Sequence, residues 1–467
     1  MHASFIAFLL LAVNVCIAGE RTVIIHLRGV YNSEIKLIPF DGLQYDFPVK
    51  ERTGVKAGDT VKFIIPEKML PGEFLFRFGY LTKSGEQPRP AGLNLMIYNE
   101  DIEVYANPQY LYGDSLFLVN DRENIIWKQF SEKDKVKRQQ IVLLEQLLEG
   151  FTDSRSPVWR TAARQYKQLR GEYNRWLKDM EETYRDLYVG HLFAFQQIPD
   201  VNWTLPENER FEQLAEHWFY RVGFNDTLCL RSRQLNDFMN AYVNLFSAKI
   251  TSEELRDSLL LRAGRLACEK ASSGNPRVYG WLVDYFYREY ESHNIPAGMQ
   301  MLEKYTDDPF CITNKKKEIA WRIDGVRTLV PGTQAANLLL EDVGGRKKVV
   351  DLRTSVKDYQ LVVFYDYDCS RCNELLGELR NWYRLPQNEV WFSIYTIALS
   401  GNREHWISDH RENAFPWTDL YAPGGFFSKA AAVYFVLSTP NMFIIDKKGK
   451  LVDLPVSVND LNKFLNG

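Results

Sequence analysis

The chain has 467 residues, of which 45% are apolar and 14% are aromatic. This composition supports packed cores and excludes an intrinsically disordered chain. At roughly 100–200 residues per domain, the length predicts two to four domains. The 57 basic and 60 acidic residues leave a net charge of -3, without the concentrated basic surface of an electrostatic nucleic-acid binder. We therefore expect no nucleic-acid partner.

The N-terminus has the pattern of an export signal. Residues 5–18 are almost entirely apolar, too short for a bilayer span of about 20 residues but suited to a secretory signal, with the small residue Ala18 marking cleavage. We expect residues 1–19 to be a signal peptide and the mature protein to act in the periplasm or cell envelope. A buried N-terminal strand or helix is the alternative. A lipid anchor at Cys16 is disfavoured, because the valine before it is not small.

Residues 20–125 alternate apolar and polar side chains between turn residues, as in "RTVIIHLRGV" and "SEIKLIPFDG". Short alternating runs of this kind predict antiparallel strands in a small β-sandwich-like domain. The segment has no cluster of His, Asp or Glu with the spacing of metal ligands. We interpret it as a structural or docking module.

Residues 126–325 carry apolar positions at three- and four-residue steps, which predict an all-α domain. One long helix is expected across "RTAARQYKQLRGEYNRWLKDMEETYRDLYVGHLF". Cys268 lies in a helical pattern and is expected in the core. Cys229 and Cys311 are candidates for pairing, because export permits disulfides.

Residues 326–467 predict an α/β domain. A hairpin is expected around Gly344–Gly345, a buried strand at 361–365, a second buried strand at 390–399, and a hairpin within 441–454 followed by a short helix. The helix after the first strand has one apolar stripe, formed by Cys372, Leu375, Leu376, Leu379, Trp382 and Tyr383.

Cys369 and Cys372 stand where that strand ends and that helix begins. The first turn of a helix presents unpaired N–H groups and the positive end of its dipole, which favour a thiolate. Cys369 is therefore the expected nucleophile, and Cys372, facing inward one turn later, the expected resolving thiol. Arg371 favours the thiolate and Asp368 opposes it, so we expect both residues to tune the pair.

The cysteine pair has two other interpretations. A zinc site needs a second pair of ligands, and the nearest histidines, His405 and His410, are expected five residues apart in the next helix. A structural disulfide across two residues would close too short a loop to stabilise much. Redox exchange is favoured over both. Thr439–Pro440 is a candidate cis peptide, which would leave the backbone of Thr439 free to pair with an incoming chain.

Residues 331–467 resemble the TlpA/ResA type of thioredoxin-fold thiol–disulfide oxidoreductases. The resemblance lies in "NLLLEDVGGRKKVVDL", "VVFYDYDCSRC" and "STPNMFIIDKKGKLV". Asp368 stands where the common form has Trp, as in a branch with "FYDxDCxxC" found in multidomain envelope proteins of Gram-negative bacteria, with β and helical domains of unknown function upstream. The resemblance implies that Cys369 is the nucleophile, Cys372 the resolving thiol and Thr439–Pro440 the cis-proline element. The family's acidic residue in the strand after the active-site helix has no counterpart in "IYTIAL".

The sequence thus predicts a three-domain extracytoplasmic thiol–disulfide oxidoreductase, a reductase or isomerase, acting on protein disulfides. No dissociable cofactor and no metal are expected, since the redox group is the Cys369–Cys372 pair. The resemblance implies a membrane-embedded thiol reductase as electron donor. One rival is a non-catalytic envelope scaffold whose thioredoxin-fold domain only docks partners. A copper-delivery relative would use CxxxC spacing and a downstream His, and none follows His410.

Overall fold

The computed structural model describes residues 19–467 except 46, 113–114, 120, 152, 294 and 467. The predicted signal peptide, with Cys16, lies outside the described residues apart from Gly19. The chain forms two compact units. One runs up to Tyr285 and includes Phe310–Ile312, and the other comprises Phe286–Pro309 and the residues from Thr313 onward. No helix in the described ranges is long and apolar enough to cross a bilayer.

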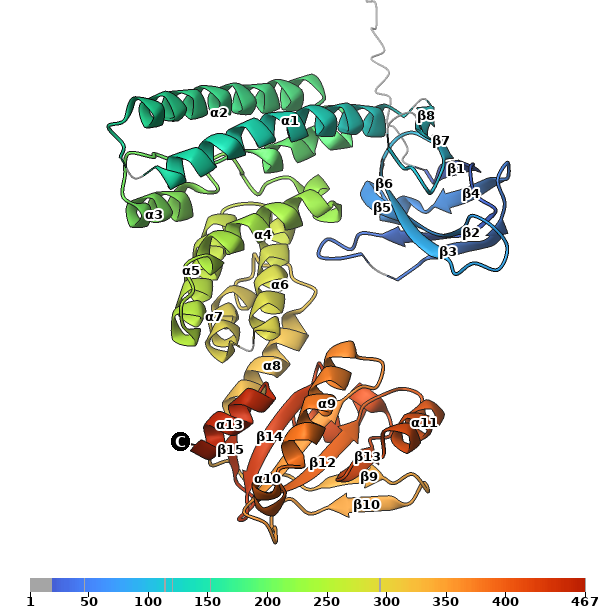
Figure 1. The fold of residues 1–467 in the computed structure, drawn as a ribbon, viewed down its shortest axis with the longest axis vertical. Helices are drawn as coiled ribbons and strands as arrows, with labels where there is room; N and C mark the ends of the chain where they lie inside the picture. Colours follow the sequence, from blue (N-terminus) through green and yellow to red (C-terminus); the bar gives the residue numbers. More distant parts are fainter. Residues whose placement is uncertain are drawn as a thin grey trace, which may run out of the picture. The chain divides into compact units, whose positions relative to one another are not determined.

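The first unit begins with two four-stranded sheets (Figure 1). Their strands are β1 (Arg21–Leu27), β2 (Asn32–Pro39), β3 (Lys50–Val55), β4 (Thr60–Ile65), β5 (Gly72–Leu81), β6 (Arg89–Ile97), β7 (Ile102–Ala106) and β8 (Leu116–Val119). The orders are β4-β1-β7-β8 and β3-β2-β5-β6. Alternate side chains of both sheets share one apolar core, so the strands form a sandwich. The pairing of β1 with β7 is parallel, whereas the sequence predicted antiparallel strands only.

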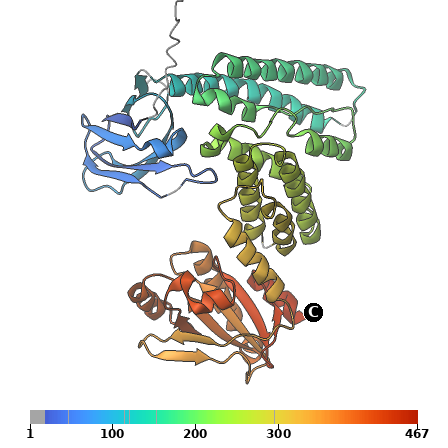
Figure 2. The same ribbon diagram turned by 180° about the vertical axis from the view of Figure 1, so that it is seen from behind.

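Helices follow the sandwich. They are α1 (Arg122–Gly150), α2 (Pro157–Thr183), α3 (Glu207–His217), α4 (Arg233–Ser247), α5 (Glu253–Ala271), α6 (Pro276–Ser292), α7 (Pro296–Thr306) and α8 (Lys316–Thr328). α1 and α2 lie side by side (Figures 1 and 2). α6 crosses from one unit into the other, and α7 and α8 belong to the second unit. The predicted domain boundaries at 125 and 325 stay predictions.

The long helix predicted through residue 193 was wrong at its C-terminal end. α2 ends at Thr183, and Tyr188–Gln196 forms a 3₁₀ helix. The buried carboxylate of Glu123 accepts hydrogen bonds from the backbone N–H groups of Tyr188 and Val189, both at 2.9 Å. These two N–H groups therefore bond to a side chain of α1. They are not available for the backbone hydrogen bonds that a regular helix needs at these positions.

The second unit contains a seven-stranded sheet of order β10-β9-β13-β12-β11-β14-β15 (Figure 2). Its strands are β9 (Leu338–Glu341), β10 (Lys347–Val350), β11 (Tyr359–Tyr365), β12 (Phe392–Ala398), β13 (Thr418–Tyr421), β14 (Asn441–Asp446) and β15 (Leu451–Asp453). Its helices are α9 (Ser370–Tyr383), α10 (Pro386–Trp391), α11 (Arg403–Asn413), α12 (Lys429–Val433) and α13 (Val458–Asn466). Both predicted hairpins are confirmed.

The connectivity at the centre of this sheet is that of the thioredoxin fold. β11 leads through α9 into parallel β12, and the β14–β15 hairpin with α13 completes the order β12-β11-β14-β15. Alternate residues of β11 feed two apolar cores, one on each face of the sheet. The predicted second strand starts two residues late, at Phe392, because α10 takes the preceding residues. β13 was not predicted.

Candidate active site

The cysteine pair lies at the junction of β11 and α9, as predicted. Cys369 is the N-cap of α9, and its Sγ accepts a hydrogen bond from the backbone N–H of Cys372 at 3.2 Å. The N–H of Cys369 donates to the carbonyl of Asp366 at 3.2 Å, and the amide of Asn373 donates to the carbonyl of Tyr367 at 3.0 Å. The Cys369 sulfur thus occupies the place where a helix terminus stabilises negative charge.

The two thiols differ in burial. Cys372 is fully buried among the apolar side chains between α9 and the sheet, whereas Cys369 is half-buried. Burial first, and hydrogen bonding to Cys369 second, raise the pKa of Cys372 to about 12, against hydrogen bonds to Asp366 and Thr439 that lower it. Cys372 therefore stays a protonated thiol at neutral pH, and Cys369 is the more accessible of the two cysteines.

Strand register places the Thr-Pro element beside the dithiol. β14 runs antiparallel to β11 with Asn441 opposite Phe364, so the residues before Asn441 lie where β11 leaves the sheet. The Sγ–H of Cys369 points at the carbonyl of Thr439 at 3.7 Å, and the Thr439–Pro440 peptide bond is cis. The predicted substrate-binding role of this element stays a prediction.

Side chains from the helical part of the second unit support the chain just before the cis-proline. The Ser438 hydroxyl donates to Glu291 at 3.4 Å, and Glu291 also accepts from Arg322 on α8 at 2.9 Å. Phe435 packs over Gly325 of α8, where any Cβ would meet the Phe435 side chain at 2.6 Å. α8 thus packs against the chain segment that leads to the cis-proline beside the dithiol.

The two residues predicted to tune the thiolate are both solvent-exposed. Asp368 precedes the N-cap and Arg371 lies in the first turn of α9. Interactions between exposed charges are weakened by solvent and salt. Their predicted opposition stays a prediction, and we expect its effect to shrink at high ionic strength.

Asp419 is a buried carboxylate that was not predicted from the sequence, and it contacts α11. Asp419 on β13 has a fully buried side chain. Its carboxylate accepts from the hydroxyls of Tyr365 and Thr396 at 3.1 Å and 2.6 Å, from the Trp406 indole at 3.1 Å, and binds His410 at 2.8 Å. β12 has no acidic residue, as noted from the sequence, but the neighbouring strand supplies one. The single charge in the apolar segment "WTDLY" was the available signal.

The remaining cysteines lie in the first unit. Cys268 is fully buried in α5, as predicted. Burial raises its pKa, with a further contribution from Cys311, so Cys311 is its neighbour. No disulfide joins Cys229 to Cys311, and the suggested pairing is not met. In the ranges that the structure covers, no group of three or more His, Cys, Asp or Glu side chains is arranged to hold a metal ion.

The difference in burial predicts the order of alkylation. In the reduced protein, iodoacetamide at neutral pH is expected to modify Cys369 well before Cys372, because only the thiolate reacts and Cys372 is buried with a pKa raised to about 12. Peptide mapping by mass spectrometry measures the order. Buried Cys268 is the internal control and should remain unmodified. Faster labelling of Cys372 would reverse the two roles.

No family model and no curated protein matches this chain. Among solved structures, a thioredoxin-like protein from Bacteroides caccae aligns over 58% of this chain and 97% of its own length, with 16% identity and a TM-score of 0.40. The thioredoxin domain of a thiol-disulfide oxidoreductase from Bacteroides vulgatus aligns over 30% of this chain and 96% of its own length, with 22% identity and a TM-score of 0.26. A thiol-disulfide oxidoreductase from Bacteroides fragilis aligns over 29% of this chain and 98% of its own length, with 22% identity and a TM-score of 0.25. The thioredoxin topology assigned to the second unit rests on its own strand order.

Proposed function

We propose that this protein is an extracytoplasmic thiol–disulfide oxidoreductase acting on protein disulfides. One observation carries the proposal: the sulfur of a half-buried cysteine caps a helix and accepts a hydrogen bond from the backbone N–H of a second, fully buried cysteine. The carbonyl of Thr439 lies across from the outer sulfur. A helix N-terminus favours the thiolate form of the attacking cysteine. Burial keeps the second thiol protonated before the mixed disulfide forms.

In the reductive direction, the Cys369 thiolate attacks one sulfur of a substrate disulfide. The new S–S bond joins substrate to Cys369, and the other substrate sulfur leaves as a thiolate that takes up a proton. Cys372 then loses its proton and attacks the Cys369 sulfur, releasing the second substrate thiolate. The substrate gains two electrons and two protons, and the Cys369–Cys372 pair becomes a disulfide.

The oxidised pair must be reduced again for a second turnover. We propose a membrane-embedded thiol reductase as that electron donor and the cell envelope as the location of both proteins. No dissociable cofactor takes part. A reduction potential near roughly -270 mV would define a reductase and one near roughly -120 mV an oxidant.

Insulin reduction tests the proposal. With dithiothreitol as the reductant, the full-length protein is expected to accelerate precipitation of the insulin B chain, and Cys369→Ala is expected to fall to the rate with dithiothreitol alone, because the attacking sulfur is gone. Cys311→Ala is the matched control and should keep the wild-type rate. Equal rates with and without wild-type protein would favour the scaffold interpretation, in which the thioredoxin-fold unit only docks partners.

A further inference from the structure

The loop that follows β13 exposes two adjacent phenylalanines. Its sequence is "PGGFF", residues 423–427. Phe427 is 100% exposed and Phe426 is 36% exposed, although phenylalanine is among the residues most often buried in folded proteins. The two rings form a small apolar surface in the second unit, which we call the Phe426–Phe427 surface.

The backbone of this loop is ordered and packs on the end of β12. Gly424 and Gly425 have φ angles of +93° and +57°, a left-handed conformation that residues with a side chain rarely adopt. An added Cβ at Gly425 would meet the carbonyl oxygen of Leu399 at 2.5 Å. Gly425–Phe427 forms a 3₁₀ turn, and the N–H of Phe427 donates to the carbonyl of Gly424 at 3.0 Å. The two rings are therefore carried by a turn with a defined place in the fold.

The Phe426–Phe427 surface and the dithiol belong to the same edge of the sheet. β11, β12 and β13 are parallel neighbours, so the dithiol loop and the "PGGFF" loop both leave from the carboxyl ends of strands. Beyond β12, the N–H of Leu399 donates to the carbonyl of Tyr365 at 2.8 Å, and the N–H of Ala422 donates to the carbonyl of Ala398 at 3.0 Å. Neighbouring strands lie about 4.8 Å apart, so the ends of β11 and β13 are roughly 10 Å apart.

The area of the surface fits one side chain of a bound polypeptide. A phenylalanine side chain buries roughly 150–250 Å², so one fully exposed ring and one ring exposed by a third offer roughly 200–350 Å². A stable interface between folded proteins needs about 800 Å² from each partner, which is more than this surface supplies to a second copy of the chain. A protein disulfide, in contrast, has to bring its own chain to Cys369, and the residues beside its cysteine then lie along this edge.

We propose that the Phe426–Phe427 surface selects protein disulfides in which an apolar side chain stands about three residues from the attacked cysteine. An extended chain advances about 3.3 Å per residue, so three residues span the roughly 10 Å between the two loops. Apolar side chains are mostly buried in native proteins, so the preferred substrates are unfolded or misfolded chains. This inference rests on the proposed function, because it names the substrate class of the same dithiol.

The rate at which full-length Cys372→Ala captures peptides tests the surface. The probes are disulfide-linked dimers of a blocked glycine–serine peptide with one central cysteine, and with phenylalanine three residues before it, three residues after it, or absent. Attack by the Cys369 thiolate forms a protein–peptide disulfide and releases the other peptide as a thiolate. Mass spectrometry follows the adduct and maps it to Cys369. One of the two phenylalanine peptides is expected to react roughly five- to tenfold faster than the peptide without phenylalanine, because partial burial of one ring favours binding by about that factor.

Two matched variants connect this preference to the loop. In the Cys372→Ala background, Phe427→Ser should remove the preference among the peptides. It should leave the rate with glutathione disulfide unchanged, because that compound carries no apolar side chain. Val356→Ser is the control and should keep the preference. Val356 is also fully exposed, but it precedes β11 and so stands at the opposite end of this strand from the dithiol.

The outcomes separate this inference from the proposed function. Equal rates for the three peptides, or a preference that survives Phe427→Ser, would overturn the role of the surface, while adducts with glutathione disulfide would still support the dithiol. Failure of Cys369 to form adducts with any of the four disulfides would overturn both proposals. A dimer of the wild type that becomes a monomer with Phe427→Ser on gel filtration would assign the surface to a second copy of the chain and overturn its role in substrate selection.

Discussion

Replacing Cys372 with alanine is expected to trap substrates as covalent adducts. Attack by Cys369 remains possible, because its place at the N-cap of α9 does not depend on the Cys372 side chain. Release is blocked, because the resolving thiol beside Cys369 has been removed. In cells of its own host, Cys372→Ala should accumulate species of high mass on non-reducing gels that collapse to the monomer on reduction. Mass spectrometry of these species identifies the substrates without a prior guess.

Two further variants control this experiment. Cys369→Ala in the same background should form few adducts or none, because the first bond to the substrate cannot form. Cys311→Ala, which removes a cysteine outside the dithiol unit, should behave as the wild type. A scaffold would recover the same partners with both dithiol variants and without disulfide linkage. That result would remove the enzymatic proposal and leave a docking protein.

Replacing Asp419 with alanine is expected to destabilise the second unit by about 3–5 kcal/mol. The fully buried carboxylate is the shared partner of Tyr365, Trp406 and His410, and its loss leaves their donors unpaired in an apolar core. Tyr365 is the last residue of β11, from which the dithiol loop departs. Hydrogen exchange of β12 and β13, which reports this unit alone, measures the effect.

Asp358→Ala is the matched control, because it removes the same group from an exposed pair with Lys447 at 3.1 Å. Such a pair contributes about 0–1 kcal/mol.

The stability loss caused by Asp419→Ala should also depend on pH. The hydrogen bond to Asp419 raises the pKa of His410 above its ordinary 6.5, so this pair stabilises fully below about 6.5 and less as the pH rises through the folded value. Equal stability losses in both variants would contradict the role assigned to Asp419.

The dithiol and its neighbourhood were predictable because their signals are local. An uninterrupted apolar run indicates a strand buried on both faces, and apolar side chains at helical spacing after Cys369 indicate which face of α9 packs inward. Thr439–Pro440 was a candidate cis peptide because this X-Pro bond stands just before a hairpin strand, and the bond is cis. In the first unit the alternation of apolar residues was enough to predict a sandwich. It was not enough to show that β1 and β7 run parallel, since alternation carries no strand direction.

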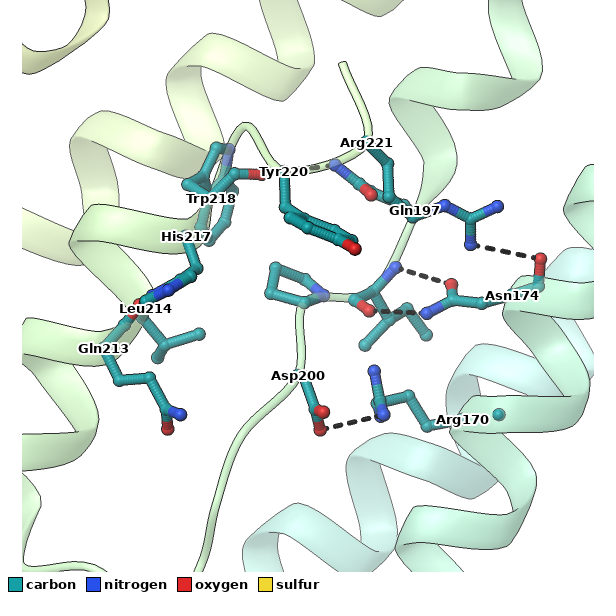
Figure 3. Close-up of a pocket in the computed structure, with 13 residues that line it drawn as sticks. Arg170, Asn174, Gln197, Asp200, Gln213, Leu214, His217, Trp218, Tyr220 and Arg221 are labelled. Carbon is teal, nitrogen blue, oxygen red and sulfur yellow. Dashed lines mark hydrogen bonds and ion pairs between the residues drawn. The ribbon is translucent and has the colours of Figure 1, made fainter. Parts of the chain in front are cut away.

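The dithiol, the elements that carry it and the inward stripe of α9 could be predicted from the sequence, because each depends on residues close together in the chain. The features that bring distant residues together became visible only in the folded structure. α2 ends at Thr183, and the backbone N–H groups of Tyr188 and Val189 donate to Glu123 of α1. Asp419 is one of 60 acidic residues in the sequence, and its hydrogen bonds to Tyr365 and His410 form only in the folded protein. A cavity is lined by residues of α2, of α3 and of the segment 197–200, which are distant in the chain (Figure 3). Contacts between residues that are far apart in the chain depend on how the elements pack. Local sequence patterns do not show this packing.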